Sequence, residues 1–378
     1  MDIAYVTNVV YPFVTGGAEK RVHEIGTRLA DRGHTVTIYG RHFWDGSKER
    51  EFAGMTLRGV SPERELYTGN RRSIYEALEF SKDLIRPLRR HTSEHDIIIA
   101  SVFPYFPVLT AQLSTISVDL PIVTTWHEVW GEYWNDYLGY LAPFGKVVER
   151  ITAQVPQYPI AVSSVTADGL TKLGPSREQI TVVPNGINID RIKEVEPTND
   201  GFEIIFVGRL IKDKNVDQLI QAFDNVASNE PSITLGIIGD GPKKEALKQM
   251  AETCDNSNQI TFLGFLDEYD DVLAHMKSAN VFVSPSTREG FGITYLEAMA
   301  AGCNVIGANH PDSAASEVIN DAGYVIEPTV RAITDTLEKV LDGKHPQKDP
   351  IKVAQQYDWD RVTDQAENAY QHAIDGTW

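Results

Sequence analysis

The stretch "ANVFVSPSTREGFGITYLEAMAAG", residues 279–302, contains a strand, a turn and a helix in direct succession. Its first part is apolar and β-branched, which predicts a buried strand. The part after Gly292 has good helix formers and a helical spacing of apolar residues. The turn between them carries Glu289 in front of a "GFG" sequence, and Glu297 follows eight positions later, inside the helix. A turn with a carboxylate and two glycines is better suited to a ligand than to packing.

Short apolar strands alternate with amphipathic helices through the rest of the chain. The first series predicts a helix over about 18–32 and strands over 2–9, 35–41, 96–102, 121–127, 158–164 and 180–186. The polar segment 192–201, with its Pro and Gly, is typical of a linker. The second series predicts strands over 202–210, 233–241, 260–266, 279–286 and 303–310. Alternation of this kind predicts two doubly wound α/β domains, whose parallel sheets bind ligands at the carboxyl ends of the strands.

Composition excludes several classes of protein. The chain has 53 acidic and 35 basic residues, a net charge of −18, which disfavours nucleic-acid binding. Its two cysteines give neither a metal-ligand spacing nor a disulfide framework. We find no signal peptide and no apolar run long enough to span a membrane, so we expect a cytoplasmic protein. The segment 71–90 has six basic and three acidic residues and is either a solvated helix face or a contact with anionic lipid at the inner face of a membrane.

Two motifs near predicted strand ends are suited to phosphate. Gly16 and Gly17 precede a helix, whose N-terminal N–H groups can bind a phosphate or a sugar hydroxyl, although the turn could simply need glycine. The dinucleotide fingerprint GxGxxG is absent, which disfavours a Rossmann oxidoreductase. Arg209 directly follows a strand and Lys214 lies five residues on, a pair of cations that fits a leaving diphosphate. The alternative is surface charge paired with Asp213.

The two glutamates of the first stretch are suited to hydroxyl groups. A carboxylate only accepts hydrogen bonds and has two oxygens, so it fits a pair of neighbouring hydroxyls on a sugar or a ribose. Glu289 and Glu297 could therefore hold two sugars of one ligand, with phosphate against the backbone of the turn. The alternative is a helix cap formed by Glu289 and a solvated Glu297.

Eight segments together resemble glycosyltransferase family 4. They stand in the family's order over nearly the whole chain and are "GGAEKRVHEIGTRLADRGHTVTIYG", "TTWHEVW", "AVSSVTADGL", "VVPNGINID", "FVGRLIKDKNVDQLIQAF", "IIGDGPKKEALKQMA", "ITFLGFL" and "STREGFGITYLEAMAAGCNVIGA". The resemblance implies the GT-B fold, two Rossmann-like domains facing across a cleft that holds the active site. It implies an acceptor-binding domain over 1–191, a donor-binding domain over 202–355 and a last helix, about 360–376, that packs back on the first domain.

The same resemblance implies a role for each matching residue. The implied catalytic residues are His127, Arg209, Lys214 and Glu289. In the donor site, Glu289 would contact sugar hydroxyls, Glu297 the ribose diol, and Arg209 and Lys214 the diphosphate. The full set of implied donor-binding residues is Gly17, Gly208, Arg209, Lys214, Gly264, Phe265, Leu266, Glu289, Gly290, Phe291, Gly292, Ile293 and Glu297.

The acceptor is expected at the first domain. The segment 126–144 follows a strand and holds three Trp and three Tyr, whose rings suit sugar faces or a lipid interface. The alternative is an ordinary packed loop and helix. The residues expected to border the acceptor are Gly16, Trp126, Glu128, Trp130 and Trp134.

The resemblance implies a retaining transfer of a hexose from a UDP- or GDP-sugar to a glycan or a lipid-linked glycan, as part of glycan biosynthesis. No obvious covalent nucleophile is present, so the departing phosphate is expected to take the acceptor proton. No cofactor is expected, and no metal: "DWD" (358–360) is interpreted as the start of the last helix. The alternatives are a non-catalytic nucleotide-sugar-binding subunit and an epimerase of the same fold. A phosphorylase would need a pyridoxal-binding lysine that we do not find.

The chain departs from the family pattern at two places. Asn188 stands where the family commonly has Asp, and Asp190 is expected to take over the structural role of that residue. The sequence "SAASE" (313–317) replaces a glycine-rich loop that lies near the donor in relatives. This second departure leaves the identity of the donor open.

Overall fold

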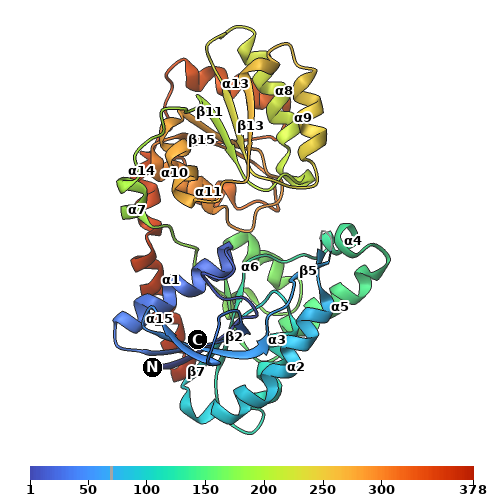
Figure 1. Ribbon diagram of the computed structural model, residues 1–378, viewed down its shortest axis with the longest axis vertical. Coiled ribbons are helices and arrows are strands. Elements are labelled where there is room, and N and C mark those ends of the chain that lie inside the picture. The colour runs from blue at the N-terminus through green and yellow to red at the C-terminus, as the bar shows by residue number, and fades with distance from the viewer. Residues whose placement is uncertain (69–70) are drawn as a thin grey trace. The chain divides into compact units, whose positions relative to one another are not determined.

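The computed structural model describes residues 1–68 and 71–378, which form two compact units (Figure 1). The first unit comprises Met1–Asn185 and Trp359–Trp378, and the second comprises Gly186–Asp358. The chain therefore passes from one unit to the other twice, at residues 185–186 and again at 358–359. These limits differ from the expected 1–191 and 202–355.

The segment expected to be a linker belongs to the second unit. It begins in α7 (Ile189–Glu194) and lies against α10 (Tyr269–Ser278). Lys277 Nζ donates hydrogen bonds to the carbonyls of Lys193 (2.9 Å) and Val195 (2.5 Å). Ser278 Oγ donates to the carbonyl of Thr198 (2.9 Å). The polar composition of 192–201 thus reflects a surface segment fixed by its backbone carbonyls, not a free connection.

The sheet of the first unit has eight strands, parallel except for one hairpin at its edge. In spatial order they are β10 (Thr181–Val182), β9 (Tyr158–Ala161), β8 (Ile122–Trp126), β7 (Ile97–Ser101), β1 (Asp2–Val6), β2 (Thr35–His42), β4 (Met55–Pro62) and β3 (Glu49–Phe52). Strand order reverses between β1 and β7, so this is the position where a doubly wound sheet binds its ligand. A short separate hairpin joins β5 (Tyr67–Thr68) to β6 (Arg71–Arg72).

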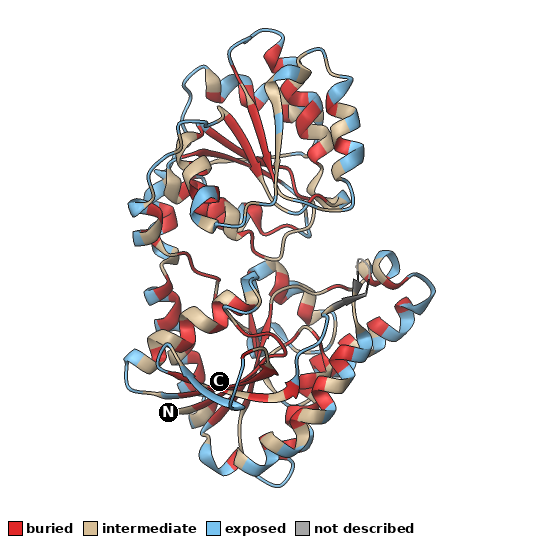
Figure 2. Cartoon of the chain, viewed as in Figure 1, coloured by how far each residue is buried: buried red, intermediate tan, exposed pale blue. Residues whose placement is uncertain are grey.

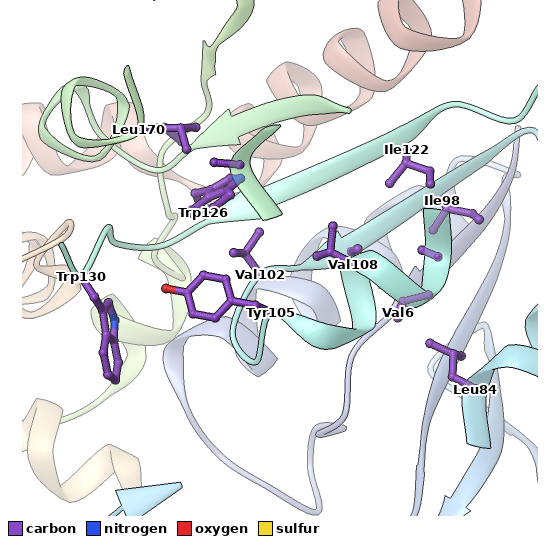
Figure 3. Packing of buried hydrophobic residues seen from close by; sticks show 14 of the residues in the cluster. Val6, Leu84, Ile98, Val102, Tyr105, Val108, Ile122, Trp126, Trp130 and Leu170 are labelled. Carbon is purple, nitrogen blue, oxygen red and sulfur yellow. The ribbon is translucent and has the colours of Figure 1, made fainter. Parts of the chain in front are cut away.

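Alternate residues of the central strands point to opposite faces of this sheet. Ile3 and Tyr5 of β1 pack beneath α1 (Gly17–Asp31) and α15 (Trp359–Asp375). Ala4 and Val6 pack on the other face, in the core shown in Figure 3. The helices of that second layer are α2 (Ile74–His91), α3 (Phe106–Thr115), α4 (Tyr133–Leu138), α5 (Ala142–Gln154) and α6 (Ser164–Thr171).

The sheet of the second unit has six strands, all parallel. In spatial order they are β13 (Ile260–Gly264), β12 (Leu235–Ile238), β11 (Ile204–Val207), β14 (Val281–Ser284), β15 (Asn304–Ala308) and β16 (Tyr324–Ile326). The order reverses between β11 and β14. Figure 2 shows the inner strands of this sheet as largely buried, whereas the edge strands β13 and β16 are mostly half-buried and exposed residues lie on loops and outer helix faces.

Helices cover both faces of the second sheet. On one face, α8 (Val216–Ala227), α9 (Lys244–Glu252) and α13 (Val330–Leu341) bury apolar residues against the sheet. On the other face, the ring of Tyr295 in α11 (Ile293–Ala301) packs edge-on against Phe282 of β14, with centroids 6.0 Å apart. The remaining helices are α10, α12 (Ala315–Ile319) and α14 (Pro350–Ala354).

Every strand expected from the sequence is present, but most end earlier than expected. The stretch expected as 202–210, for example, is a strand only over Ile204–Val207. The residues that follow are apolar enough to look like strand, yet their backbone turns away at the carboxyl edge of the sheet. The hairpin β3–β4 and the edge strand β16 were not expected, because β3 is charged, β4 alternates buried and half-buried residues, and β16 has only three residues.

Candidate active site

Two loops meet at the reversal point of the second sheet, one after β11 and one after β14. Thr287 N donates to the carbonyl of Asp213 (2.9 Å), and Asn215 Nδ2 donates to the carbonyl of Pro285 (2.9 Å). Asn215 makes this possible by adopting a left-handed backbone, with φ of 48°. The two loops are therefore fixed to each other at the edge where a ligand is expected.

This contact brings together two of the residues singled out in the sequence. Lys214 Nζ donates to the Glu289 carboxylate, and both side chains are largely buried. Asp213, the alternative partner considered for these cations, instead lies 3.8 Å from Arg288. Lys214 and Glu289 therefore form an ion pair at this edge of the sheet.

The backbone of Glu289 is held by the loop after β15. Glu289 N donates to the carbonyl of Asp312 (3.0 Å), and Ala314 N donates to the carbonyl of Glu289 (2.9 Å). Ser313 and Ala314 belong to the "SAASE" segment that departs from the family pattern. The unusual loop thus directly positions the carboxylate that is expected to contact the donor sugar.

Arg209 is exposed at the same edge, and no ion pair of its guanidinium occurs among the described residues. It follows Gly208, which lies against the turn after β12: a Cβ added to Gly239 would come within 1.9 Å of the Gly208 carbonyl oxygen. The backbone near Arg209 is therefore closely packed while its side chain remains available to an anion.

The "GFG" turn begins α11. Gly292 is the N-terminal cap with φ of +87°, and a Cβ there would lie 2.5 Å from the Tyr295 ring. Phe291 has its side chain buried, with its ring 5.9 Å from that of Tyr357. Phe291 thus anchors the turn, and Gly290 and Ile293 flank it. The N-terminal N–H groups of α11 are suited to a negatively charged group at this point.

Glu297 lies farther along α11 and is only 2% exposed. Its carboxylate interacts with the hydroxyl of Tyr269, whose pKa is raised by burial and by the charge of Glu297. The structure therefore does not bring Glu297 to the Lys214–Glu289 pair. A contact between Glu297 and a ribose stays a prediction.

The residues expected near the base lie at the end of β13. Gly264 has φ of +77° and its carbonyl accepts from Gly239 N (2.7 Å), while Phe265 is 71% exposed and Leu266 half-buried. Sequence reasoning missed an ion pair beside them, Lys244 Nζ to Asp240 Oδ2 at 2.5 Å. The ion pair could have been found from the sequence, because Asp240 and Lys244 lie four residues apart in the quoted segment "IIGDGPKK".

In the first unit, Gly16 and Gly17 form the start of α1, as the sequence predicts, with Gly16 as the cap. Sequence reasoning missed Glu19 in the first turn of this helix. The Glu19 side chain is buried, and burial raises its pKa. The Arg72 guanidinium lies 3.9 Å from it.

His127 follows β8 and is half-buried. Burial, with a smaller effect from the charge of Arg21, lowers its pKa to about 3, so the ring is neutral at physiological pH. Arg21, another residue that the sequence reasoning missed, is buried in α1. Its Nη1 donates to the carbonyl of Pro184 (2.5 Å) and to Asn185 Oδ1 (3.1 Å).

The structure buries Trp126, Trp130 and Trp134, so a contact between these side chains and the acceptor stays a prediction. Their side chains are 0%, 9% and 6% exposed and belong to the core of the first unit (Figure 3). Glu128 is also engaged, because it accepts from Trp130 Nε1 at 2.6 Å. The tryptophans thus pack as in the ordinary loop and helix that we kept as the alternative, whereas Tyr140 and Phe144 of the same segment are exposed.

A buried carboxylate organises this aromatic segment. Glu149 in α5 has no exposed surface and accepts from Tyr105 Oη (2.9 Å), Trp130 N (2.7 Å), Gly131 N (3.0 Å) and Trp134 Nε1 (3.0 Å). Four donors satisfy both carboxylate oxygens, which makes burial of the charge tolerable. The glutamate was not noticed in the sequence because its donors, Tyr105 and residues 130–134, lie in two segments away from it in the chain.

One further expectation is corrected. Asn188 itself caps α7, since its Oδ1 accepts from Arg191 N (2.9 Å), whereas Asp190 pairs with Lys193 at the surface. An amide oxygen caps a helix as well as a carboxylate does. Asp190 therefore does not take over the role of the usual aspartate.

Two sequence models of known families match this chain. The model for Glycosyltransferase Family 4 matches residues 15–191, and the model for Glycosyl transferases group 1 matches residues 188–357. The chain belongs to glycosyltransferase family 4. This family-4 chain is thus a glycosyltransferase, and its two doubly wound sheets are those of the GT-B fold.

Individual proteins agree with this assignment. The chain is 26% identical to a glycogen synthase of Mycobacterium tuberculosis, over 98% of this chain and 94% of that protein. It is 23% identical to an alpha-monoglucosyldiacylglycerol synthase of Streptococcus pneumoniae, over 82% and 72%. Among solved structures, sucrose-phosphate synthase from Thermosynechococcus elongatus superposes with a TM-score of 0.79 at 17% identity, covering 99% of both chains. Anabaena HepE in complex with UDP and glucose gives 0.74 at 18%, covering 98% and 99%.

The described residues of the family-4 chain also bear on metals and membranes. Within residues 1–68 and 71–378, no three His, Cys, Asp or Glu side chains are grouped so that they could hold a metal ion. In the "DWD" segment, Trp359 is fully buried and Asp360 pairs with Arg28 at 2.6 Å. In the same part of the chain, every helix is too short or too polar to cross a bilayer.

Proposed function

We propose that this family-4 enzyme transfers a hexose from a nucleoside diphosphate sugar to a hydroxyl of a glycan or lipid-linked glycan, with the anomeric configuration retained. The observation that carries the proposal is the charged group at the reversal point of the second sheet. There the Lys214–Glu289 pair and the exposed Arg209 stand beside the N-terminus of α11. This set offers cations and N–H donors to a diphosphate and a carboxylate to sugar hydroxyls.

The Lys214–Glu289 pair explains how both groups stay partnered before and after binding. A diphosphate oxygen replaces the Glu289 carboxylate as the partner of Lys214, and donor hydroxyls replace Lys214 as partners of Glu289. Neither charge is then left without compensation, which would be costly for side chains this far from water. A nucleotide-sugar donor is supported by the solved relative HepE, which was crystallised with UDP and glucose. The proposed base is uracil or guanine.

The proposed reaction breaks the bond between the anomeric carbon and the diphosphate and forms a bond from that carbon to the acceptor oxygen on the same face. The acceptor proton passes to an oxygen of the departing diphosphate. Arg209 and Lys214 stabilise the charge that builds on that diphosphate. His127 contributes as a neutral ring, because its pKa of about 3 keeps it unprotonated. The enzyme is proposed to work in the cytoplasm, where it touches the inner face of a membrane.

The proposal is tested by titrating UDP and GDP into the wild-type protein and into Arg209→Ala, followed by calorimetry. We expect one of the two nucleotides to bind, and Arg209→Ala to weaken that binding. Lys212→Ala is the matched control, since Lys212 is an exposed cation three residues away. If neither nucleotide binds, or if both variants bind like wild type, the site has been assigned wrongly. The anomeric configuration of the product, read by NMR once a donor is known, tests retention.

A further inference from the structure

Exposed apolar side chains gather on a few helices of the first unit. Of the fourteen large apolar side chains that are exposed among the described residues, eleven lie between Ile74 and Ile151. They belong to α2, to the end of α3 and the turn after it, to the turn Gly139–Leu141 and to α5. Because α3 contacts both α2 and α5, these three helices form one layer on the sheet. We call its outer surface the α2–α3–α5 face (Figure 1).

A cavity of about 60 Å³ opens among the N-terminal turns of these helices. Its lining is almost wholly apolar and includes Ile74, Ala77, Phe106, Phe144, Trp134 and Val148. Ile74 and Phe144 also belong to the exposed set, so the cavity opens on the α2–α3–α5 face. An apolar cavity of this kind excludes water and accepts an apolar guest. The helices start after the carboxyl ends of the strands, so the cavity lies on the same edge of the sheet as His127.

The exposed charges of the three helices are of one sign, whereas the turn after α3 carries the exposed Asp119. On α2 and α5 every exposed charged residue is basic, namely Lys82, Arg86, Arg89, Arg90 and Arg150. The acidic residues of these helices are buried or half-buried, and Glu76 and Glu149 are buried inside hydrogen-bond networks. The side chain of Arg71, at the start of the basic segment 71–90, lies outside those described. A basic, apolar face on a chain of net charge −18 complements an anionic surface.

We propose that the α2–α3–α5 face docks on an anionic lipid bilayer and that its cavity receives a hydrocarbon chain of the lipid. Apolar side chains insert among the acyl chains while the basic residues contact phosphate headgroups. A second copy of this chain fits the face less well, because it would bring the same basic side chains against each other. Resting on the proposed function, the inference names the acceptor as a lipid whose hydroxyl is presented at the His127 edge.

Vesicle binding tests the docking directly. The probes are vesicles of phosphatidylcholine alone and of equal parts phosphatidylcholine and phosphatidylglycerol, sedimented with the protein at low and high salt. We expect binding to the anionic vesicles, weakened by salt, and little binding to the neutral ones. Val147→Glu, at a residue 54% exposed on α5, should weaken binding by about 10-fold or more. Ile351→Glu is the matched control, because Ile351 is 42% exposed but belongs to the second unit. This substitution should leave vesicle binding unchanged.

Quenching of tryptophan by brominated acyl chains tests the cavity. Trp134 lines it, so a chain that enters should quench the fluorescence of the wild-type protein. Ala77→Leu, which fills the cavity, should abolish this quenching and leave sedimentation with anionic vesicles intact. Ile74→Glu, at the exposed mouth, should reduce quenching without changing the core.

Three outcomes would overturn the inference. They are equal binding to both kinds of vesicle, binding unaffected by Val147→Glu, and a wild-type dimer in sedimentation velocity that Val147→Glu dissociates. Release of nucleoside diphosphate without acceptor is measured on the same proteins and should be unchanged by Val147→Glu. Failure of that release in every protein would count against the proposed function alone, since vesicle binding does not depend on it.

Discussion

The ammonium group of Lys214 donates a hydrogen bond to the carboxylate of Glu289, and the two residues come from loops that follow neighbouring strands of one parallel sheet. They are seventy-five positions apart in the chain. The loops that carry them are fixed to each other through Asp213, Asn215, Pro285 and Thr287. The pair is therefore built into the fold and does not depend on one flexible side chain.

Glu289→Gln should largely abolish transfer and leave the protein folded. The amide keeps the shape of the side chain but loses charge-assisted contacts to donor hydroxyls, so kcat/KM should fall by about 10- to 100-fold. Steady-state kinetics on the true donor measures the loss, and urea unfolding checks the fold. Glu245→Gln, an exposed glutamate on α9, is the control. If Glu289→Gln turns over as fast as the wild-type protein, Glu289 does not contact the donor.

Transfer should proceed without a divalent metal. In the proposed reaction Arg209 and Lys214 supply the positive charge that a leaving diphosphate needs, so each alanine variant should lose about 10²- to 10³-fold in turnover. EDTA should leave the wild-type rate unchanged. If EDTA abolishes activity and magnesium or manganese restores it, the prediction is wrong. A role of "DWD" in binding that metal would then have to be tested.

Glu149→Gln should destabilise the first unit by about 3 kcal/mol or more, because an amide cannot satisfy four donors that now face a carboxylate. All six tryptophans lie in the first unit, so tryptophan fluorescence during urea unfolding reports on that unit alone. Glu132→Gln is the control, since the Glu132 side chain is 86% exposed. Equal stability of the two variants would show that the buried carboxylate is not needed by the aromatic core.

His127 should make the first unit less stable in acid. Its pKa is lowered to about 3 in the folded protein from 6.5, so between these values the unfolded chain binds a proton that the folded chain does not. The contribution of His127 to the free energy of unfolding therefore decreases as pH falls from 6.5 towards 3. Compared with His127→Asn, the wild-type protein should lose stability over this window, again followed by tryptophan fluorescence. A difference between the two proteins that stays constant with pH would show that His127 titrates normally.

The alternation of apolar strands and helices was sufficient to predict both sheets, because strands buried on two faces are apolar throughout. Strands β3 and β16 lie at sheet edges and β4 alternates buried and half-buried residues, so these three strands lack the continuous apolar run that identified the others. Arg209 and Glu289 could be named as candidates from the sequence, because each lies in a loop that follows a strand, and their roles stay predictions. Glu149 and Arg21 could not, since each acts through partners from distant segments that only the fold brings together. The burial of the tryptophans in 126–144 could not be predicted for a related reason: an aromatic run has the same composition whether it lines a binding surface or fills a core.

The most direct test of the proposed transferase activity is a panel of UDP- and GDP-hexoses incubated with the wild-type protein and Glu289→Gln, without acceptor, and scored for release of nucleoside diphosphate. We predict slow release from one donor by the wild-type protein and a large loss of that release in Glu289→Gln. No release from any donor by a folded wild-type protein, or equal release by both proteins, would contradict the assignment of this edge of the second sheet as the donor site.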